Sequence, residues 1–304
     1  MGESRGDEGL KRRLEYFKQA IEIDPTYALA YVALCRTYFE LENNSILTPQ
    51  EAYPKAREAA NRALELDENL ADAHVALAGL KMNYEYNWHG AEESAKRALE
   101  INPNSARAHY MYGACLNIVG RQQEALAELE KVKALDPMQA PWSHINAHWG
   151  TRQYHRVIED ALAWLEANPA EPMAHFCLGC AYTQERMYDR AIAEFKTVLK
   201  LEELDFPGSR AGLAYAQGMS GRKSEARKIL YELLELSRKR YVRPYYVGVV
   251  YAGLGDSDRA FEWFEKAYEE RSSHLVVFKV DPFLDPIRAD PRFQALLRRM
   301  NFPP

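Results

Sequence analysis

Two pairs of side chains in this sequence have a spacing that could support chemistry. The first pair, Cys177 and Cys180, forms the only CxxC motif, which can be half of a zinc site or a redox couple. Zinc usually takes four ligands, and the sequence has no second CxxC. A redox pair usually lies at the start of a helix, whereas this pair falls inside an expected helix, where packing favours small residues. We therefore interpret both cysteines as packing residues.

The second pair is His144 and His148, which are four residues apart and would share one face of a helix. Zinc-binding helices use this spacing, but the motif here reads HINAH, without a glutamate after the first histidine. His155 and His175 are the only nearby candidates for a third ligand. We favour structural or groove-lining histidines, and a metal ion is the alternative.

Two further segments have features of nucleotide-binding sequences. Residues 218–224 lack the second glycine of a phosphate-binding loop, because Arg222 stands in its place, so we interpret them as a turn between helices. Residues 238–246 combine Arg and Lys with Tyr245 and Tyr246, which could contact phosphate or stack on bases. Positive charge also suits the C-terminal end of a helix, and we interpret this segment as a solvated helix cap.

Catalytic residues are not expected. The sequence contains no GxSxG, HExxH, DxDxDG or GxGxxG motif. Paired carboxylates such as Glu92–Glu93 and Glu202–Glu203 fall at expected surface positions, whereas a glycosidase pair needs a walled cleft. We predict that the chain is not an enzyme and needs no cofactor.

Composition argues against several classes of function. The 304 residues are 47% apolar, and the net charge of −5 disfavours a general nucleic-acid-binding protein. The longest run without Asp, Glu, Lys or Arg, residues 137–151, is too short to span a membrane. The four cysteines are sparse, and residues 1–24 are charged throughout, unlike a secretory leader. We expect reduced thiols and a cytoplasmic location.

The elements that hold these residues follow from a pattern that recurs about every 34 residues. Its clearest copies are YFKQAIEIDP (16–25), ANRALELDEN (60–69), AKRALEINPN (95–104), LEKVKALDPM (129–138) and FKTVLKLEEL (195–204). A second amphipathic segment, such as ALAYVALCRTYFE (28–40), precedes each later copy. A fixed period of this size predicts an all-α solenoid of helix pairs, which is a surface rather than a pocket and favours binding.

Small and large residues recur at fixed places within this pattern. In the third copy these are His109, Tyr112, Gly113, Leu116, Ala125, Leu129, Val132 and Pro137. The arrangement resembles the tetratricopeptide repeat, in which Gly or Ala lets two helices approach and large residues fill the space opposite. The resemblance implies a right-handed superhelix. We expect repeats near 28–70, 71–105, 106–139, 140–171, 172–206, 207–240 and 241–274.

Turn residues mark the expected helix ends. Gly120, Gly221 and Gly255 are expected in left-handed turns between the two helices of a pair. The first repeat carries an insertion at 43–53, and Pro49 and Pro54 should keep it from continuing the first helix.

The two ends depart from the pattern. Residues 10–23 should form a second helix without a first helix before it, and the tail offers one further helix, PRFQALLRRM. We therefore expect a leader at 1–9, a solenoid at 10–274 with one orphan helix and about seven repeats, and a C-terminal capping segment at 275–304.

Four stretches, at 5–31, 47–67, 222–256 and 263–300, resemble one bacterial subfamily more closely. In that subfamily the repeats form the C-terminal sensor or interaction half of winged-helix regulators, nucleotide cyclases and Ser/Thr kinases. The resemblance implies an effector domain N-terminal to this chain. We expect a fragment of a longer protein, in which Met1 to Ser4 could derive from cloning, and a natural short protein is the alternative.

In the repeat family, defined positions of the first helices point into the concave groove. The resemblance carries this over to Val32, Arg36, Arg107, Tyr110, Asn117, His144, His148, Phe176, Cys180, Tyr215 and Tyr245. In the fourth repeat the register is ambiguous, and counting back from Val157 gives Trp142, Asn146 and Trp149 instead.

A groove of this kind is aromatic and weakly charged, which suits a protein or peptide segment as partner. We therefore expect a non-catalytic scaffold, the interaction or sensor module of a bacterial signalling or regulatory protein. No binding of nucleic acid or membrane by this chain is expected. The alternative is a small-molecule or metal-ion sensor that uses the concave channel near Tyr110, His144, His148 and Phe176.

Overall fold

The fold is given by a computed structural model that describes residues 7–137, 140–201 and 207–303. Met1 to Ser4 and the Glu202–Glu203 pair lie outside the described residues. All described elements are helical. They are α1 (Asp7–Ile23), α2 (Ala28–Asn43), α3 (Pro49–Leu66), α4 (Ala71–Asn83), α5 (Trp88–Ile101), α6 (Ala106–Val119), α7 (Gln122–Leu135), α8 (Ala140–Gly150), α9 (Tyr154–Ala167), α10 (Pro172–Gln184), α11 (Tyr188–Leu201), α12 (Pro207–Met219), α13 (Lys223–Ser237), α14 (Pro244–Leu254), α15 (Ser257–Glu269), the 3-10 helices η1 (Ser273–Val277) and η2 (Pro282–Ile287), and α16 (Pro291–Arg299).

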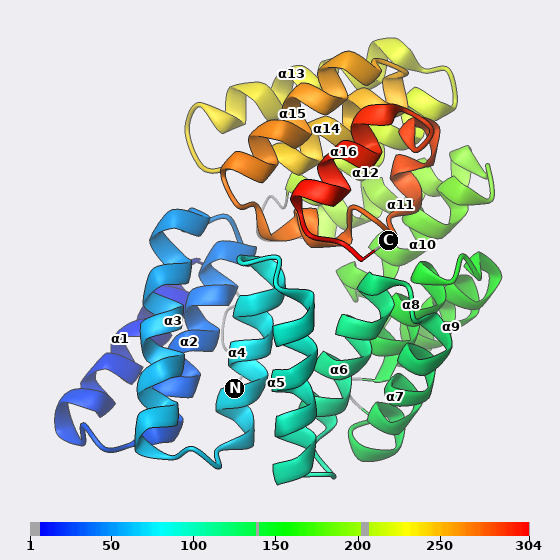
Figure 1. Cartoon of the computed structure of the whole chain (residues 1–304). Coiled ribbons are helices and arrows are strands. Elements are labelled where there is room, and N and C mark those ends of the chain that lie inside the picture. Colours follow the sequence, from blue (N-terminus) through cyan, green and yellow to red (C-terminus); the bar gives the residue numbers. More distant parts are fainter. Residues whose placement is uncertain (1–6, 138–139, 202–206, 304) are drawn as a thin grey trace.

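From α2 to α15 the helices form successive pairs that stack side by side, so the predicted all-α solenoid is confirmed (Figure 1). The chain curves from α2 through α9 and then returns, so that α13 to α15 lie above α2 and α3 in Figure 1. Helix α1 packs against α2 and buries Leu10 there, which covers the apolar side of the first pair.

Close contact within and between pairs depends on glycine opposite an aromatic ring. A Cβ atom at Gly179 would come within 2.9 Å of the Phe195 ring, and one at Gly212 within 2.6 Å of it. Phe195 of α11 therefore fills the space between two first helices, α10 and α12. Gly248 stands in the same relation to Phe264, at 2.6 Å. This is the packing role that the sequence assigned to the small residues.

Each described turn between the two helices of a pair contains a residue with positive φ. Gly120, Gly221 and Gly255 have φ of 96°, 84° and 79°, as predicted. In the first repeat the turn is shorter than expected: α2 ends at Asn43, and Thr48 and Glu51 form a capping box at the start of α3. Pro54 lies inside α3 rather than in a linker, so the extra residues mainly lengthen the two helices.

The solenoid closes on itself through the C-terminal segment, residues 273–303, which is drawn in orange to red in Figure 1. Helix α16 packs on α15, and the tail beyond it reaches the second repeat. There the indole nitrogen of Trp88 donates to the carbonyl oxygen of Met300 at 2.9 Å, and the Trp88 ring stacks on Phe302 with centroids 4.3 Å apart. Residues more than two hundred positions apart are thereby joined.

A buried ion pair joins the first and last repeats at a second point. Arg243, just before α14, is 2% exposed, and Glu42, near the end of α2, is 0% exposed. The guanidinium donates to both Glu42 carboxylate oxygens at 3.3 Å and to the Glu42 carbonyl oxygen at 2.9 Å. Ser273 Oγ of η1 donates to the same carboxylate at 3.0 Å. We call the three residues Glu42, Arg243 and Ser273 the latch.

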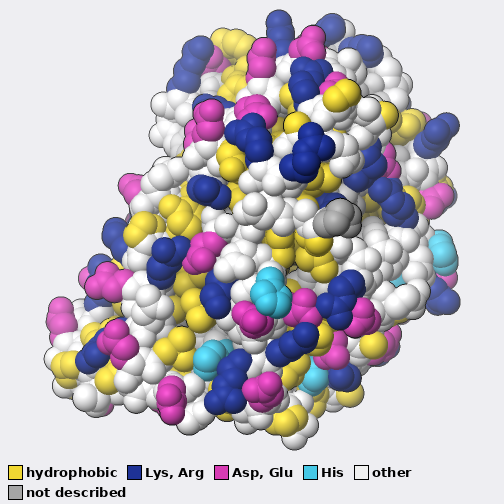
Figure 2. All heavy atoms as spheres, in the orientation of Figure 1, with side chains coloured by type: hydrophobic (Ala, Val, Ile, Leu, Met, Phe, Trp, Pro, Cys, Tyr) yellow, Lys and Arg dark blue, Asp and Glu magenta, His cyan; other side chains and the backbone are white. Residues whose placement is uncertain are grey.

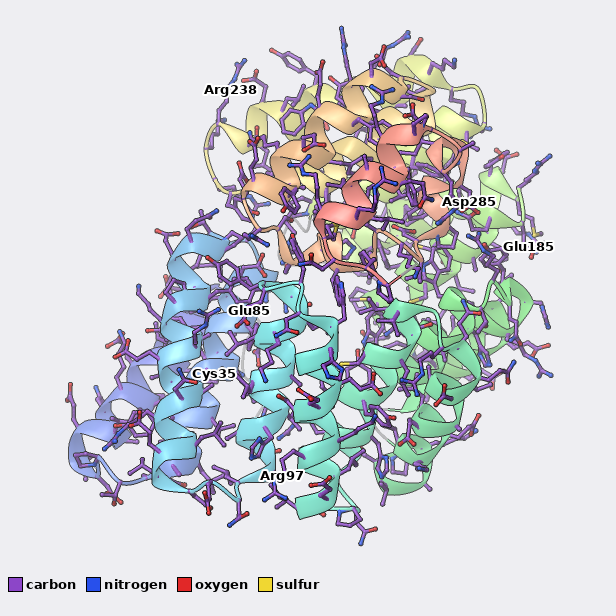
Figure 3. All side chains as sticks on the ribbon, in the orientation of Figure 1. Cys35, Glu85, Arg97, Glu185, Arg238 and Asp285 are labelled. Carbon is purple, nitrogen blue, oxygen red and sulfur yellow. The ribbon has the colours of Figure 1, made fainter. Side chains whose placement is uncertain are left out.

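The latch corrects the interpretation of residues 238–246 as a solvated cap. Arg238 fits that interpretation, since it lies at the outer edge of the molecule and pairs with Glu235 (Figure 3). Arg243 instead lies in the interior. Burial alone would lower its pKa, but Tyr246 and Glu42 beside it raise the pKa overall, so the guanidinium stays charged.

We predict that Arg243→Met lowers the free energy of unfolding by about 3–5 kcal/mol, because Glu42 would be left buried without its partner. Urea denaturation followed by circular dichroism measures the change. Arg238→Met is the matched control, and its effect should stay within about 0.5 kcal/mol because Arg238 is exposed. Equal midpoints for the two variants would contradict a buried, stabilising latch.

Candidate binding cavity on the concave face

The concave face of the solenoid is occupied by the chain's own C-terminal segment. Helix η2 places the Phe283 ring against Tyr215 of α12, with centroids 4.5 Å apart. The Tyr245 hydroxyl of α14 donates to Asp281 Oδ2 at 2.5 Å. Both tyrosines were expected in an open groove, but they are 2% and 1% exposed. The expected open groove is therefore filled. The C-terminal segment folds back into it instead of only packing on the last helix pair.

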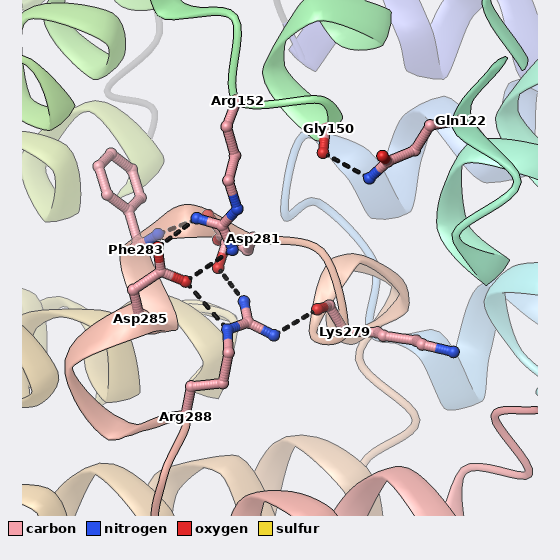
Figure 4. A network of polar contacts seen from close by, with 8 residues as sticks. All are labelled: Gln122, Gly150, Arg152, Lys279, Asp281, Phe283, Asp285 and Arg288. Atoms are coloured by element: carbon pink, nitrogen blue, oxygen red, sulfur yellow. Dashed lines mark hydrogen bonds and ion pairs between the residues drawn. The ribbon is translucent and has the colours of Figure 1, made fainter. Parts of the chain in front are cut away.

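A network of polar contacts fixes η2 in this position (Figure 4). Arg152, in the turn between α8 and α9, forms two contacts with the Asp285 carboxylate. In one of them a guanidinium nitrogen donates to Oδ1 at 2.9 Å. Arg288 donates to Asp285 at 3.0 Å and to the carbonyl oxygens of Lys279 and Asp281 at 2.6 and 3.1 Å. These contacts attach residues 279–288 to the fourth repeat.

Between the C-terminal segment and the first helices a cavity of about 320 Å³ remains. Aromatic side chains form much of its wall. Trp142 of α8 donates from its indole nitrogen to the Tyr110 hydroxyl of α6 at 3.1 Å. Phe176 of α10 lines the cavity next to these residues, and Trp149 joins the wall to Phe283, with ring centroids 5.5 Å apart.

Few polar groups reach the cavity. Asn117 donates to the carbonyl oxygen of Asn146 at 3.4 Å, and Asn146 donates to that of Trp142 at 3.0 Å. His274 of η1 contacts the rings of Tyr245 and Tyr246, with centroids 5.0 and 5.1 Å away. In the described part of the chain no hydrogen bond joins the His274 ring nitrogens to another residue.

Two titratable groups at the cavity differ in charge at neutral pH, because His274 is neutral and Asp281 is largely ionised. Burial, together with the nearby charge of Arg243, lowers the pKa of His274 to about 3, so the imidazole is neutral. Burial raises the pKa of Asp281 to about 6, although Tyr245 and the Phe283 amide donate hydrogen bonds to its carboxylate. The cavity is therefore a weakly polar space with one carboxyl group already satisfied by the protein.

The structure brings some of the expected groove residues together and separates others. Tyr110, Asn117, Phe176, Cys180 and Tyr245 line the cavity.

Four of the expected residues lie elsewhere. Arg36 is exposed on α2, and Arg107 pairs with Asp72 at 3.0 and 2.9 Å. Val32 is buried against Ala63 and Ala73. Tyr215 lies under Phe283, as described above.

The fourth repeat follows the second of the two possible registers. His148 turns away from the cavity and contacts Asp160 of α9 through Nδ1 at 2.8 Å. The side chain of His144 lies outside the described residues. Trp142, Asn146 and Trp149, obtained by counting back from Val157, line the cavity instead.

Sequence reasoning missed the groups that the C-terminal segment contributes, among them His274, Val276, Asp281 and Phe283. Two of the three Asp-Pro pairs in the tail, at 281–282 and 290–291, carried a usable signal. Asp281 and Asp290 each accept a hydrogen bond from a backbone amide two residues on and so cap the short helices that follow. These caps indicate that the tail is folded, but they do not indicate which face of the solenoid it covers.

The other candidates for chemistry behave as packing residues. Burial raises the pKa of Cys177 to about 12 and that of Cys180 well above its ordinary value, so both thiols stay protonated at neutral pH. No group of three or more His, Cys, Asp or Glu among the described residues could hold a metal ion.

On the face drawn in Figure 2, basic and acidic side chains are interspersed, and neither kind gathers into one large charged patch. Within the described ranges, no helix combines the length and the apolar character needed to cross a bilayer.

Comparison with known proteins identifies the repeats. Family models described as tetratricopeptide repeat match residues 94–127, 174–203 and 247–274. Human IFIT1, solved as a dimer with m7Gppp-AAAA, superposes with a TM-score of 0.62 at 15% identity, covering 88% of this chain and 69% of that chain. A tetratricopeptide repeat protein from Parabacteroides merdae gives a TM-score of 0.55 at 15% identity, covering 81% of this chain and 98% of that chain. These likenesses concern the fold alone.

Among curated proteins, the transcriptional regulator HilA of Salmonella typhimurium is 32% identical over 153 residues. HilA of Salmonella typhi matches equally. The match covers 50% of this chain but 27% of HilA, so the chain spans only part of the length of these relatives.

We predict that Asp281→Asn changes the pH dependence of stability. The folded-state pKa of about 6 lies above the ordinary value of 3.8, so the favourable contribution of Asp281 is present below pH 4 and is lost as pH rises through 6. Stability of the wild type should therefore fall by about 2–3 kcal/mol relative to the variant between pH 4 and 7.5. Thermal and urea denaturation at several pH values test this. Asp258→Asn, at an exposed position, is the control, and parallel profiles for wild type and Asp281→Asn would disprove the prediction.

Proposed function

We propose that this tetratricopeptide repeat protein is a non-catalytic scaffold that binds an extended protein or peptide segment on its concave face. Stacked helix pairs present a long curved surface, and repeats of this family serve as protein-interaction scaffolds. The aromatic side chains of Tyr110 and Phe176 would anchor the partner, and Asn117 would pair with its backbone.

One observation carries the proposal: the concave face already accommodates a polypeptide, the chain's own residues 273–287. This segment buries Leu275, Phe278 and Leu284 completely and forms two short 3-10 helices rather than an α-helix. A surface that accepts an irregular apolar segment in one polypeptide is suited to a similar segment of another. The partner would displace the tail to reach Tyr110 and Phe176.

The wider context is regulatory in our proposal. The similarity to HilA supports placing the chain in a bacterial signalling or transcriptional regulatory protein, as its interaction or sensor module. We propose a cytoplasmic location, an effector domain N-terminal to residue 1, and the division into a leader at 1–9, a solenoid at 10–274 and a capping segment at 275–304. The gene sequence upstream of codon 1 tests the effector domain. An in-frame winged-helix, cyclase or kinase domain supports it, and an in-frame stop codon there contradicts it.

Peptide selection tests the scaffold function. Sixteen-residue peptides displayed on phage and selected on the full chain should include binders with Kd of about 1–100 μM, measured by fluorescence anisotropy. Tyr110→Ala and Phe176→Ala should each weaken binding by about tenfold or more, because aromatic anchors dominate such interfaces. Tyr231→Ala, which removes a tyrosine 63% exposed on α13, is the matched control and should leave Kd unchanged. The scaffold proposal fails if no peptide binds saturably, or if binding depends on Tyr231 rather than on the concave residues.

A further inference from the structure

The cavity beneath the C-terminal segment has the size and chemistry of a small-molecule site. Its volume of about 320 Å³ lies in the range of ligand pockets, roughly 300–1,000 Å³. Helices α6, α8, α10, α12 and α14 supply one side of its wall, and residues 274–283 of the C-terminal segment supply the other. It is therefore complete only when the tail is folded back.

The wall favours a flat apolar molecule. Trp142, Trp149 and Phe176 present aromatic surface, and each keeps partial exposure at the cavity they line. Ala114 of α6 also keeps partial exposure there and leaves room between the rings. Aromatic faces of this kind stack on planar ligands and stabilise them mainly by dispersion and burial.

His274 supplies a polar group at the cavity, and the Oδ1 atom of Asn117 is a second one that lacks a hydrogen-bond partner among the described residues. Its imidazole lines the cavity and keeps partial exposure, although Tyr245 and Tyr246 pack against it. Its two ring nitrogens make no hydrogen bond with the described residues. A neutral imidazole has one donor and one acceptor nitrogen, and a hydroxyl group can pair with either.

We propose that this cavity binds an uncharged small molecule with a planar apolar body and one hydroxyl group, which pairs with the imidazole of His274 while the body lies against Trp142, Trp149 and Phe176. The proposal concerns the purified chain alone and does not depend on the protein partner.

The charges around the cavity exclude ions as ligands. Asp281 would repel an anion, and no described cation faces it from inside the cavity. A cation would have to compete for Asp281 with the Tyr245 hydroxyl at 2.5 Å and the Phe283 amide at 3.0 Å. Because an unpaired charge in an apolar site is strongly disfavoured, a neutral molecule is the better fit.

Binding would be coupled to the fold-back of the tail. The ligand would touch η1 and the first helices together, so it would bind the closed arrangement better than an open one and shift the population towards it. A bound ligand would therefore strengthen the closure that the latch provides, and a partner that displaced the tail would weaken ligand binding by the same factor.

A charge series of naphthalene derivatives tests the proposal on the full chain by isothermal titration calorimetry at pH 7. We expect 2-naphthol to bind with a Kd on the order of 10–100 μM and to raise Tm. Naphthalene, which lacks the hydroxyl group, should bind more weakly by roughly 3–10-fold. Ionised 2-naphthoate and 2-naphthylmethylammonium should show no saturable binding.

Two variants test where the ligand binds. Ala114→Phe fills the cavity and should abolish 2-naphthol binding while the far-ultraviolet circular dichroism spectrum is unchanged. His274→Phe should weaken 2-naphthol by about 3–10-fold and leave naphthalene unchanged, because only the hydrogen bond is lost. The control is His89→Phe, an equivalent change at an exposed position on α5, which should alter neither. The proposal is overturned if 2-naphthol does not bind the wild type, if it binds folded Ala114→Phe equally well, or if a charged derivative binds more tightly.

Discussion

The structure depends on contact between the first and last repeats. Solenoids are normally held by neighbours alone, with each repeat touching only the next one. Here the carboxylate of Glu42, on the first repeat, accepts hydrogen bonds from Arg243 and Ser273, which precede and follow the last helix pair. Two charges at 2% exposure or less are stable only with both partners in place, so this contact holds the first and last repeats together. The stacking of Trp88 on Phe302 adds an apolar contact at the other edge of the closure.

Closure changes what the concave face can do. An open solenoid offers a groove, whereas this chain lays residues 273–287 along that groove and keeps an apolar cavity beneath them. The tail thus acts both as an occupant of the face and as a wall of the cavity. A protein partner and a small ligand would meet at the same place with opposite effects on the tail, since one gains by displacing it and the other by holding it. Such an arrangement is suited to a sensor module, in which one binding event reports on another.

Local sequence patterns predicted the helix pairs, but they could not predict contacts between residues far apart in the sequence. The period of the sequence predicted the helix pairs, and Gly179 opposite Phe195 shows why small residues recur at those places. Concave aromatic residues such as Tyr110 and Phe176 were found because each lies at a fixed position of a regular repeat. For the fourth repeat the sequence left two registers open, since this repeat lacks the Gly-aromatic pair that sets the register, and His148 contacts Asp160 of α9 as in the second register. The burial of Arg243 could not be predicted, because its partner lies 201 residues away and no local feature of the tail indicates which face it covers.

Hydrogen–deuterium exchange of the unmodified chain tests the closure most directly. The amides of Leu275, Phe278 and Leu284 donate to backbone carbonyl groups inside the fold-back, at 3.0, 3.0 and 3.2 Å. If the tail is held on the concave face, peptides from residues 273–287 exchange on the timescale of α14, orders of magnitude more slowly than an unstructured chain. Complete exchange of 273–287 within seconds, while α14 stays protected, would show that the tail is free and the concave face open, contrary to this account.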